Sequence, residues 1–117
     1  MTIKRGEIHL ASLDPTIGRE ISKTRPVVII SNDINNRFSG TITILPITSM
    51  NLGKIYPFEV KLPKGAGNLP KDSKVKADQI RTLDNRRIIK AVGMLDDENM
   101  ACIESAIKIH LGLEMKI

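Results

Sequence analysis

The sequence of 117 residues contains few aromatic side chains and a single cysteine. Tryptophan is absent, and Tyr56, Phe38 and Phe58 are the only aromatic residues, so a hydrophobic core has to consist mainly of Ile, Val and Leu. The single cysteine, Cys102, excludes an internal disulfide framework and suits a reducing compartment. The first residues lack the apolar segment of a signal peptide, and no apolar run approaches membrane-spanning length. We therefore expect a cytoplasmic protein that has no membrane segment.

The usual residues of metal sites and nucleophilic sites are also scarce. His9 is expected in a strand and His110 in a helix, and neither belongs to a recognisable ligand cluster. A lone cysteine without an adjacent catalytic histidine is a poor thiol nucleophile, and no serine lies in a Gly-x-Ser-x-Gly setting. We expect neither a bound metal nor a cofactor.

Basic residues outnumber acidic residues. Eighteen Lys and Arg residues against thirteen Asp and Glu residues give a formal net charge of +5. Such a balance favours polyanionic partners, nucleic acid before membrane. The basic residues are dispersed, however, and dispersed charge more often belongs to a solvated surface than to a binding stripe.

The segment 23–33 has the strongest strand pattern. Four consecutive β-branched residues, 27–30, lie between Pro26 and Ser31 and predict a short strand that is buried on both faces. Pro26 fits the first position of a strand and keeps Arg25 extended beside it. A rigid cation next to a dry core can be aimed at an anion, but an ordinary solvent-facing arginine explains the same pattern.

Short alternating segments, together with six prolines and eight glycines, predict further strands and tight turns in a single domain, residues 1–117. Pro46 requires an edge position or a bulge, beyond which Thr48 either leaves the ladder or decorates a β face. Residues 82–85 would connect two of the strands. The polar loop 16–24 is too long for a hairpin turn, and such loops often carry function. Asn32 can cap a short helical turn. The predicted strands cover 7–13, 41–49, 57–62, 74–80 and 86–93, with a last short strand at 113–117.

One amphipathic helix is predicted near the C-terminal end. Asp96 is a suitable N-cap, and Gly112 stops the helix. Cys102 and Ile109 lie opposite its apolar face and indicate a second packing partner. The apolar face consists of Met100, Ile103, Ile107 and Leu111.

A chain with few acid–base groups suits one reaction in particular. RNA carries its own nucleophile, the 2′-hydroxyl, beside the scissile phosphate. Cleavage then needs positioning, a proton acceptor, and donors that stabilise charge developing on the phosphate. The Arg25 fork and the Thr48 hydroxyl could supply these donors, whereas arginine is a poor base because it stays protonated in proteins. Glu20 could orient the guanidinium or accept the 2′ proton.

Several segments closely resemble the MazF/PemK-type toxins, the endoribonuclease members of toxin–antitoxin pairs. The match is colinear over nearly the whole chain. The segments that carry it are Arg5-Gly6-Glu7-Ile8, Asp14-Pro15-Thr16-Ile17-Gly18, Glu20, Lys23-Thr24-Arg25-Pro26-Val27-Val28-Ile29, Ser31-Asn32-Asp33, Asn36-Arg37-Phe38-Ser39, Pro46-Ile47-Thr48 and Asp78-Gln79-Ile80-Arg81-Thr82-Leu83-Asp84.

The resemblance implies a mainly-β fold, an SH3-like (CcdB/PemK-type) barrel with short helices and a C-terminal amphipathic helix. It also implies a homodimer that cleaves single-stranded RNA at selected sequences without a metal, and that an acidic antitoxin protein neutralises. The family's catalytic arginine falls on Arg25, its catalytic threonine on Thr48 and its acidic loop residue on Glu20. The expected RNA contacts are Arg19, Lys23, Ser31, Asn32, Asp78 and Gln79.

Two positions depart from the family pattern. His9 stands where the family often has Trp or Tyr, which puts base stacking there in question, an interaction worth about 1–3 kcal/mol per base elsewhere. The loop Gly18-Arg19-Glu20-Ile21-Ser22-Lys23 differs from the Gly-Ser-Glu-Gln form of many members, so the RNA sequence preference cannot be carried over.

Two other functions fit the same fold. A non-enzymatic inhibitor of the gyrase-poison type acts through protein contacts and needs no phosphate site. A simple RNA- or protein-binding barrel would leave Arg25 and Thr48 on the surface without a catalytic role. Fold alone does not separate these functions, and the combination of Arg25, Thr48 and Glu20 favours the endoribonuclease.

Overall fold

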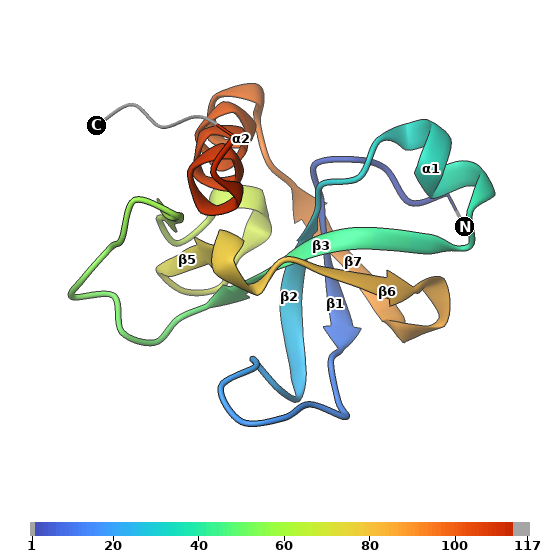
Figure 1. The fold of residues 1–117 in the computed structure, drawn as a ribbon, viewed down its shortest axis with the longest axis horizontal. Helices are drawn as coiled ribbons and strands as arrows, with labels where there is room; N and C mark the ends of the chain where they lie inside the picture. Colours follow the sequence, from blue (N-terminus) through green and yellow to red (C-terminus); the bar gives the residue numbers. More distant parts are fainter. Residues whose placement is uncertain (1, 114–117) are drawn as a thin grey trace.

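The computed structural model describes residues 2–113. Within this range the chain is mainly β, with two α-helices and three short 3-10 turns, as the sequence predicts (Figure 1). The elements are β1 (Glu7–Ser12), β2 (Thr24–Ile29), α1 (Asp33–Phe38), β3 (Thr41–Thr48), β4 (Glu59–Leu62), η1 (Ala66–Asn68), β5 (Ser73–Lys76), η2 (Ala77–Gln79), β6 (Arg81–Asp84), η3 (Asn85–Arg87), β7 (Ile88–Met94) and α2 (Asp97–Leu111).

The seven strands form one antiparallel sheet in the order β4-β5-β3-β2-β1-β7, and β6 pairs with β3 outside this path. Strand β3 is therefore central and has three partners. Its first half pairs with β6 along Thr41–Ile44, and its end pairs with β5 along Ile47–Thr48. Pro46 lies between these two stretches and opposite Val27 of β2. The change of partner leaves Pro46 without a ladder partner on the side away from β2, so the proline has a local edge position, as predicted, although β3 itself is central.

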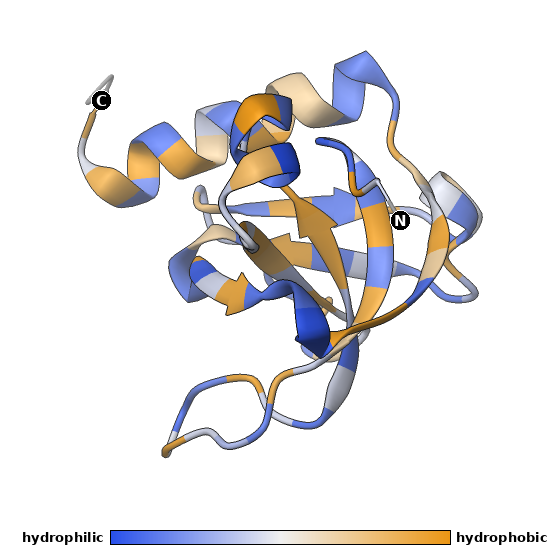
Figure 2. Cartoon of the chain, turned by 90° about the vertical axis from the view of Figure 1, so that its right-hand side faces the viewer, coloured by the Kyte–Doolittle hydropathy of each residue, from blue (hydrophilic) through white to orange (hydrophobic). Residues whose placement is uncertain are grey.

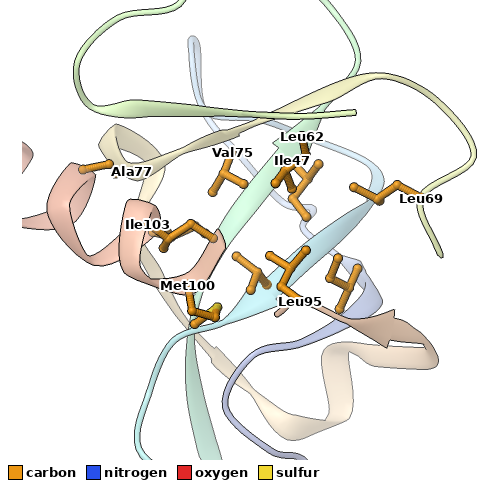
Figure 3. Close-up of a cluster of buried hydrophobic side chains, with 12 residues drawn as sticks. Ile47, Leu62, Leu69, Val75, Ala77, Leu95, Met100 and Ile103 are labelled. Atoms are coloured by element: carbon orange, nitrogen blue, oxygen red, sulfur yellow. The ribbon is translucent and has the colours of Figure 1, made fainter. Parts of the chain in front are cut away.

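Strand β2 is buried on both faces, which confirms the prediction for the β-branched run. Val27 and Ile29 belong to one hydrophobic cluster with Ile42 and Ile44. Val28 points to the opposite face and belongs to a second cluster, beneath α2. Figure 3 shows Met100 and Ile103 of α2 directed into this second cluster, toward the strands that carry Ile47, Leu62 and Val75.

The C-terminal helix has the predicted ends. The Asp96 side chain accepts a hydrogen bond from the Asn99 N–H, and Gly112 closes the helix in the left-handed region at φ 70°. Hydrophobic and hydrophilic segments alternate along α2, as expected for a helix with one buried face (Figure 2). That face contains Met100, Ile103 and Ala106, whereas Leu111 is exposed, so the predicted apolar face extends one turn too far.

The predicted strands 74–80 and 86–93 have different limits in the structure. The first ends at Lys76 as β5, and residues 77–79 form the turn η2, because the chain must bend between β5 and β6, which both pair with β3. The second begins two residues later than predicted, as β7. Residues 82–85 were expected to form a connection, but residues 82–84 belong to β6. The predicted last strand lies almost entirely outside the described residues. Neither α-helix in the described chain is long and apolar enough to span a membrane.

Gly93 of β7 lies against the turn η1, and its contacts allow a direct test of this packing. A Cβ at residue 93 would lie 2.2 Å from the carbonyl oxygen of Gly67, a backbone atom that a side-chain movement cannot displace. We expect Gly93→Ala to lower the free energy of unfolding by about 1–3 kcal/mol, as overpacked sites do. The matched control is Gly53→Ala, where a Cβ meets nothing within 4 Å; its effect should stay within about 0.5 kcal/mol in urea unfolding. Equal stability of the two variants would contradict the described packing.

Candidate active site

A cavity of about 430 Å³ lies where the β1–β2 loop (residues 13–23) meets the ends of β2, β3 and β5. In Figure 1 the β1–β2 loop and the loop between β3 and β4 are the long segments that extend from the sheet. Six of the nine residues predicted for the site line this cavity. They are Arg19, Glu20, Arg25, Thr48, Asp78 and Gln79.

Arg25 enters the cavity from the beginning of β2, opposite Ala11 of β1. Its Nε–H donates a 3.1 Å hydrogen bond to the carbonyl oxygen of Ser22. Within residues 2–113 its two Nη atoms donate to no protein acceptor. Because a guanidinium has five N–H donors in a planar fork, four of them are left for an anion in the cavity.

Thr48 is the last residue of β3, and its hydroxyl has a defined role in the local hydrogen bonds. Its Oγ1 accepts a 3.1 Å hydrogen bond from the Met50 N–H. Since this bond uses a lone pair of the oxygen, the hydroxyl hydrogen remains available to donate. Thr48 therefore faces the cavity as a second donor beside Arg25.

Glu20 lies on the exposed β1–β2 loop, at the rim of the cavity. Its Oε1 accepts a 3.1 Å hydrogen bond from the Ile17 N–H, and its Oε2 has no protein partner in the described chain. Within the described chain, no hydrogen bond or ion pair joins Glu20 to the Arg25 guanidinium, so the expected orienting contact is not formed. The free carboxylate oxygen leaves Glu20 available as a proton acceptor.

Gln79 positions the β1–β2 loop. Its Oε1 accepts from the Ile21 N–H at 3.2 Å, and its Nε2 donates to the Arg19 carbonyl at 3.3 Å. Arg81 adds a third contact, from Nη1 to the Leu13 carbonyl at 2.7 Å. Gln79 thus lines the predicted RNA groove with both ends of its amide bound to the loop.

The other three predicted RNA contacts lie away from the cavity. Lys23 is exposed but does not line it. The Ser31 hydroxyl bonds Asn36 and accepts from the Thr43 N–H, and Asn32 caps α1 by accepting from the Asn35 N–H at 2.8 Å. Ser31 and Asn32 therefore serve the β2–α1 connection in this structure.

Two lysines in the cavity wall were not among the predicted site residues. Lys74 and Lys76 of β5 share a buried carboxylate, Glu59, at 3.1 Å and 2.8 Å respectively. Sequence alternation predicts Glu59 and Lys61 on the polar face of their strand, yet the Glu59 side chain is fully buried. The basic spacing at 74 and 76 was the available signal, but the buried partner depends on pairing with β4 and is not visible in the sequence.

Hydrogen bonding determines the charge state of this ion network. Burial alone would oppose ionisation of Glu59, but hydrogen bonds from Lys76, the Tyr56 N–H and Lys74 outweigh it and hold the pKa of Glu59 below its ordinary value. Burial likewise opposes the charge of Lys76, while Glu59 and Asp78 raise its pKa. The carboxylate and the Lys76 ammonium are therefore both charged near neutral pH.

His9 is buried in β1, with 2% of its surface exposed. Its Nε2 lies 3.2 Å from Oε1 of Glu7. A ring in this position cannot offer a face to a nucleobase, which agrees with the departure from the family pattern noted at this residue.

A second cavity of about 480 Å³ adjoins the first. The two share a wall formed by the β1–β2 loop and the turn η2, and the second continues past Pro46 and Arg81. The loop that Gln79 holds therefore stands between two adjacent cavities.

The sequence and the fold match those of known toxins. The profile of a family described as "PemK-like, MazF-like toxin of type II toxin-antitoxin system" matches residues 4–111. The endoribonuclease MazF9 of Mycobacterium tuberculosis is 38% identical over 116 residues, which cover 95% of this chain and 98% of the relative. The chain thus belongs to the PemK-like, MazF-like toxin family of type II toxin–antitoxin systems, and the resemblance found in its sequence is confirmed.

Solved structures agree with this assignment. MazF of Deinococcus radiodurans superposes with a TM-score of 0.83 at 28% identity, over 96% of this chain and 98% of that chain. A MazE–MazF structure from the same organism gives a TM-score of 0.75 at 25% identity, over 96% of this chain and 97% of that chain. The mainly-β fold with short helices and a C-terminal helix is therefore that of MazF.

The lowered pKa of Glu59 predicts how stability depends on pH. In the unfolded chain a glutamate titrates near pH 4.3, so the folded protein binds fewer protons than the unfolded chain in this range. The contribution of Glu59 is thus complete above the ordinary carboxyl pKa and disappears as the pH falls through the lower, folded value. We expect the unfolding free energy of the parent to fall more steeply from about pH 6 to about pH 3 than that of Glu59→Gln. Parallel urea-unfolding curves across this range would contradict the buried ion network.

Proposed function

We propose that the protein is a sequence-selective endoribonuclease that cleaves single-stranded RNA, the toxin of a toxin–antitoxin pair. The observation that carries the proposal is the pairing of a guanidinium with free Nη atoms and a threonine hydroxyl at one cavity. A relative that is 38% identical over 95% of this chain is named an endoribonuclease, which supports the same activity.

The proposed reaction uses the RNA 2′-hydroxyl as the nucleophile and needs no metal ion. The 2′ oxygen attacks phosphorus, the bond from phosphorus to the 5′ oxygen breaks, and a 2′,3′-cyclic phosphate and a 5′-hydroxyl result. Arg25 and Thr48 donate hydrogen bonds to the non-bridging oxygens as charge develops on them. The free carboxylate oxygen of Glu20 accepts the 2′ proton, and the leaving 5′ oxygen takes a proton from solvent.

The residues around this centre are proposed to bind the neighbouring nucleotides. Arg19 and Lys23 add positive charge to the β1–β2 loop, and phosphate neutralisation of this kind supplies affinity without sequence selection. Asp78 and Gln79 lie in the wall that the two cavities share, where they can meet bases. The hydrogen bonds of Ser31 and Asn32 within the fold make them the weakest of the proposed RNA contacts.

Substitutions of Arg25 and Thr48 test the catalytic proposal. Arg25→Lys keeps the charge but loses the planar fork, Arg25→Ala loses both, and Thr48→Ala removes the hydroxyl donor. Loss of one donor aimed at a developing oxyanion costs about 10²–10³ in rate, so each variant should cleave RNA at least about a hundredfold more slowly. RNA affinity should fall far less. The measurement is mapping and timing of cleavage of a long RNA in EDTA, with binding followed separately.

The matched control is Arg86→Lys. Arg86 is an exposed arginine that pairs with Asp84 at the far end of β6 and does not line the cavity. The Arg86→Lys protein should cleave RNA at the parental rate. A folded Arg25→Ala protein with unchanged activity would remove the catalytic proposal, and RNA binding without cleavage by the parent would favour the simple RNA-binding alternative.

We further propose that the protein is a cytoplasmic homodimer neutralised by an acidic antitoxin. Structures of relatives include MazF in complex with MazE. The positive residues of the cavity wall favour carboxylates that mimic phosphates. Exposed Cys102 and Ile109 on the outer side of α2 offer a second packing surface for the dimer.

Two measurements test the homodimer and the antitoxin contact. Light scattering should give the mass of two chains for the free protein, and addition of the acidic antitoxin should displace RNA because both occupy the Arg25 cavity. The displacement should weaken as salt rises, since the contacts are between opposite charges. A monomer at every concentration contradicts the dimer, and RNA binding that persists at saturating antitoxin contradicts occlusion of the cavity.

A further inference from the structure

We propose that Lys74 is a positioning residue of this site: its buried ammonium group fixes the β3–β4 loop (residues 49–58) and thereby holds the Thr48 hydroxyl in its donating arrangement. The inference rests on the proposed role of Thr48 as a phosphate donor. Lys74 acts through the loop and is not asked to touch the RNA.

Every N–H of the Lys74 ammonium has an acceptor. Nζ donates to the Asn51 carbonyl at 2.9 Å, to the Lys54 carbonyl at 3.2 Å, and to Oε1 of Glu59 at 3.1 Å. The residue is 3% exposed. An ammonium has three donors, so this charge is fully satisfied and is held in one geometry.

The last residues of the β3–β4 loop are held by other contacts, because the Phe58 carbonyl accepts from the Ala77 N–H and the Tyr56 N–H donates to Glu59. The first part of the loop, residues 49–55, has few such contacts. Within the described chain, no well-formed backbone–backbone hydrogen bond ties residues 49–55 to another segment. Asn51 also adopts a left-handed conformation, at φ 57°, which a non-glycine residue rarely keeps without support. The two carbonyls bound by Lys74 lie on either side of the turn at residues 52–53. Lys74 is therefore the main constraint on the conformation of residues 49–55.

The loop connects this constraint to the catalytic proposal. Thr48 and Lys74 are direct partners in the pairing of β3 with β5, so their side chains lie on the same face. Asn51, three residues after Thr48, is bound through its carbonyl by Lys74. Met50 lies between Thr48 and Asn51, and its N–H donates to Thr48 Oγ1. If the loop is released, Met50 no longer fixes the Thr48 hydroxyl, and the donor loses its preferred direction.

The test compares Lys74→Met with Lys61→Met. Lys61 is an exposed lysine on β4 and faces Lys74 in the register, so it matches the site in residue type and neighbouring strands but not in contacts. Misplaced catalytic groups cost up to about a hundredfold in rate, so we expect kcat of Lys74→Met to fall about 10- to 100-fold. Its KM for a single-stranded RNA should stay close to the parental value. Lys61→Met should match the parent in both quantities.

A second measurement does not depend on activity. Hydrogen exchange of the Met50 amide should be slow in the parent and in Lys61→Met, and fast in Lys74→Met, while the core amides of β2 and β3 stay protected. Rapid exchange at Met50 in the parent would overturn the proposal before any variant is made. If the parent does not cleave RNA, the proposed function fails, and this measurement still decides whether Lys74 holds the loop.

A double variant covers the case in which Lys74→Met does not fold. Glu59→Gln combined with Lys74→Met removes the carboxylate together with its more deeply buried partner, and Lys76 keeps its ion pair with Asp78. Neutral replacement of a buried ion pair is often tolerated. It should fold, lose the Met50 protection and show the same fall in kcat. Parental kcat in either folded variant overturns the proposal, and so does a change confined to KM, which would indicate direct RNA binding by Lys74.

Discussion

The pairing of β3 with three different strands is the constraint on which the site depends. Its first half binds β6, its middle binds β2 and its end binds β5, so one strand fixes the positions of all the others around the cavity. The change of partner occurs beside Pro46, a residue that cannot donate to a ladder. Thr48 follows two residues later, at the end of the strand, where its side chain lines the cavity while its backbone remains paired with Lys74.

Charge in the cavity wall is divided between groups that are satisfied and groups that are free. Glu59 neutralises Lys74 and Lys76. Without it, their charges would lose water without gaining a partner, which is strongly destabilising. Arg25 is different, because only its Nε is bound and its Nη atoms are open to a ligand. The lysines therefore stabilise the wall, and the arginine supplies the unpaired positive charge that an incoming phosphate would meet.

Local signals in the sequence predicted much of the fold and part of the site. The β-branched run of β2, the cap at Asp96 and the loop 16–24 depend on neighbouring residues, and the structure confirms the strand and the helix ends. Residues 77–79 alternate like a strand but form a turn, because β5 and β6 must both reach β3. The burial of Glu59 was not predicted either, because it too depends on strand pairing that is distant in the sequence. Its partners are set by the register of β4, β5 and β3, which are distant in the sequence.

The two proposed phosphate donors, Arg25 and Thr48, lie on a different kind of structure from the loop proposed to select the RNA sequence. Arg25 and Thr48 lie at the ends of core strands, and each is paired with a neighbouring strand: Arg25 with Ala11 of β1, and Thr48 with Lys74 of β5. This pairing limits their movement. The β1–β2 loop, by contrast, is held by side chains, with Gln79 at its middle and Arg81 at its base. Substitutions in that loop at positions other than Glu20 and Ser22 leave the strand ends that carry Arg25 and Thr48 in place. The departure from the family pattern at residues 18–23 keeps Glu20, the proposed proton acceptor, so we expect it to alter sequence preference more than the proposed cleavage step.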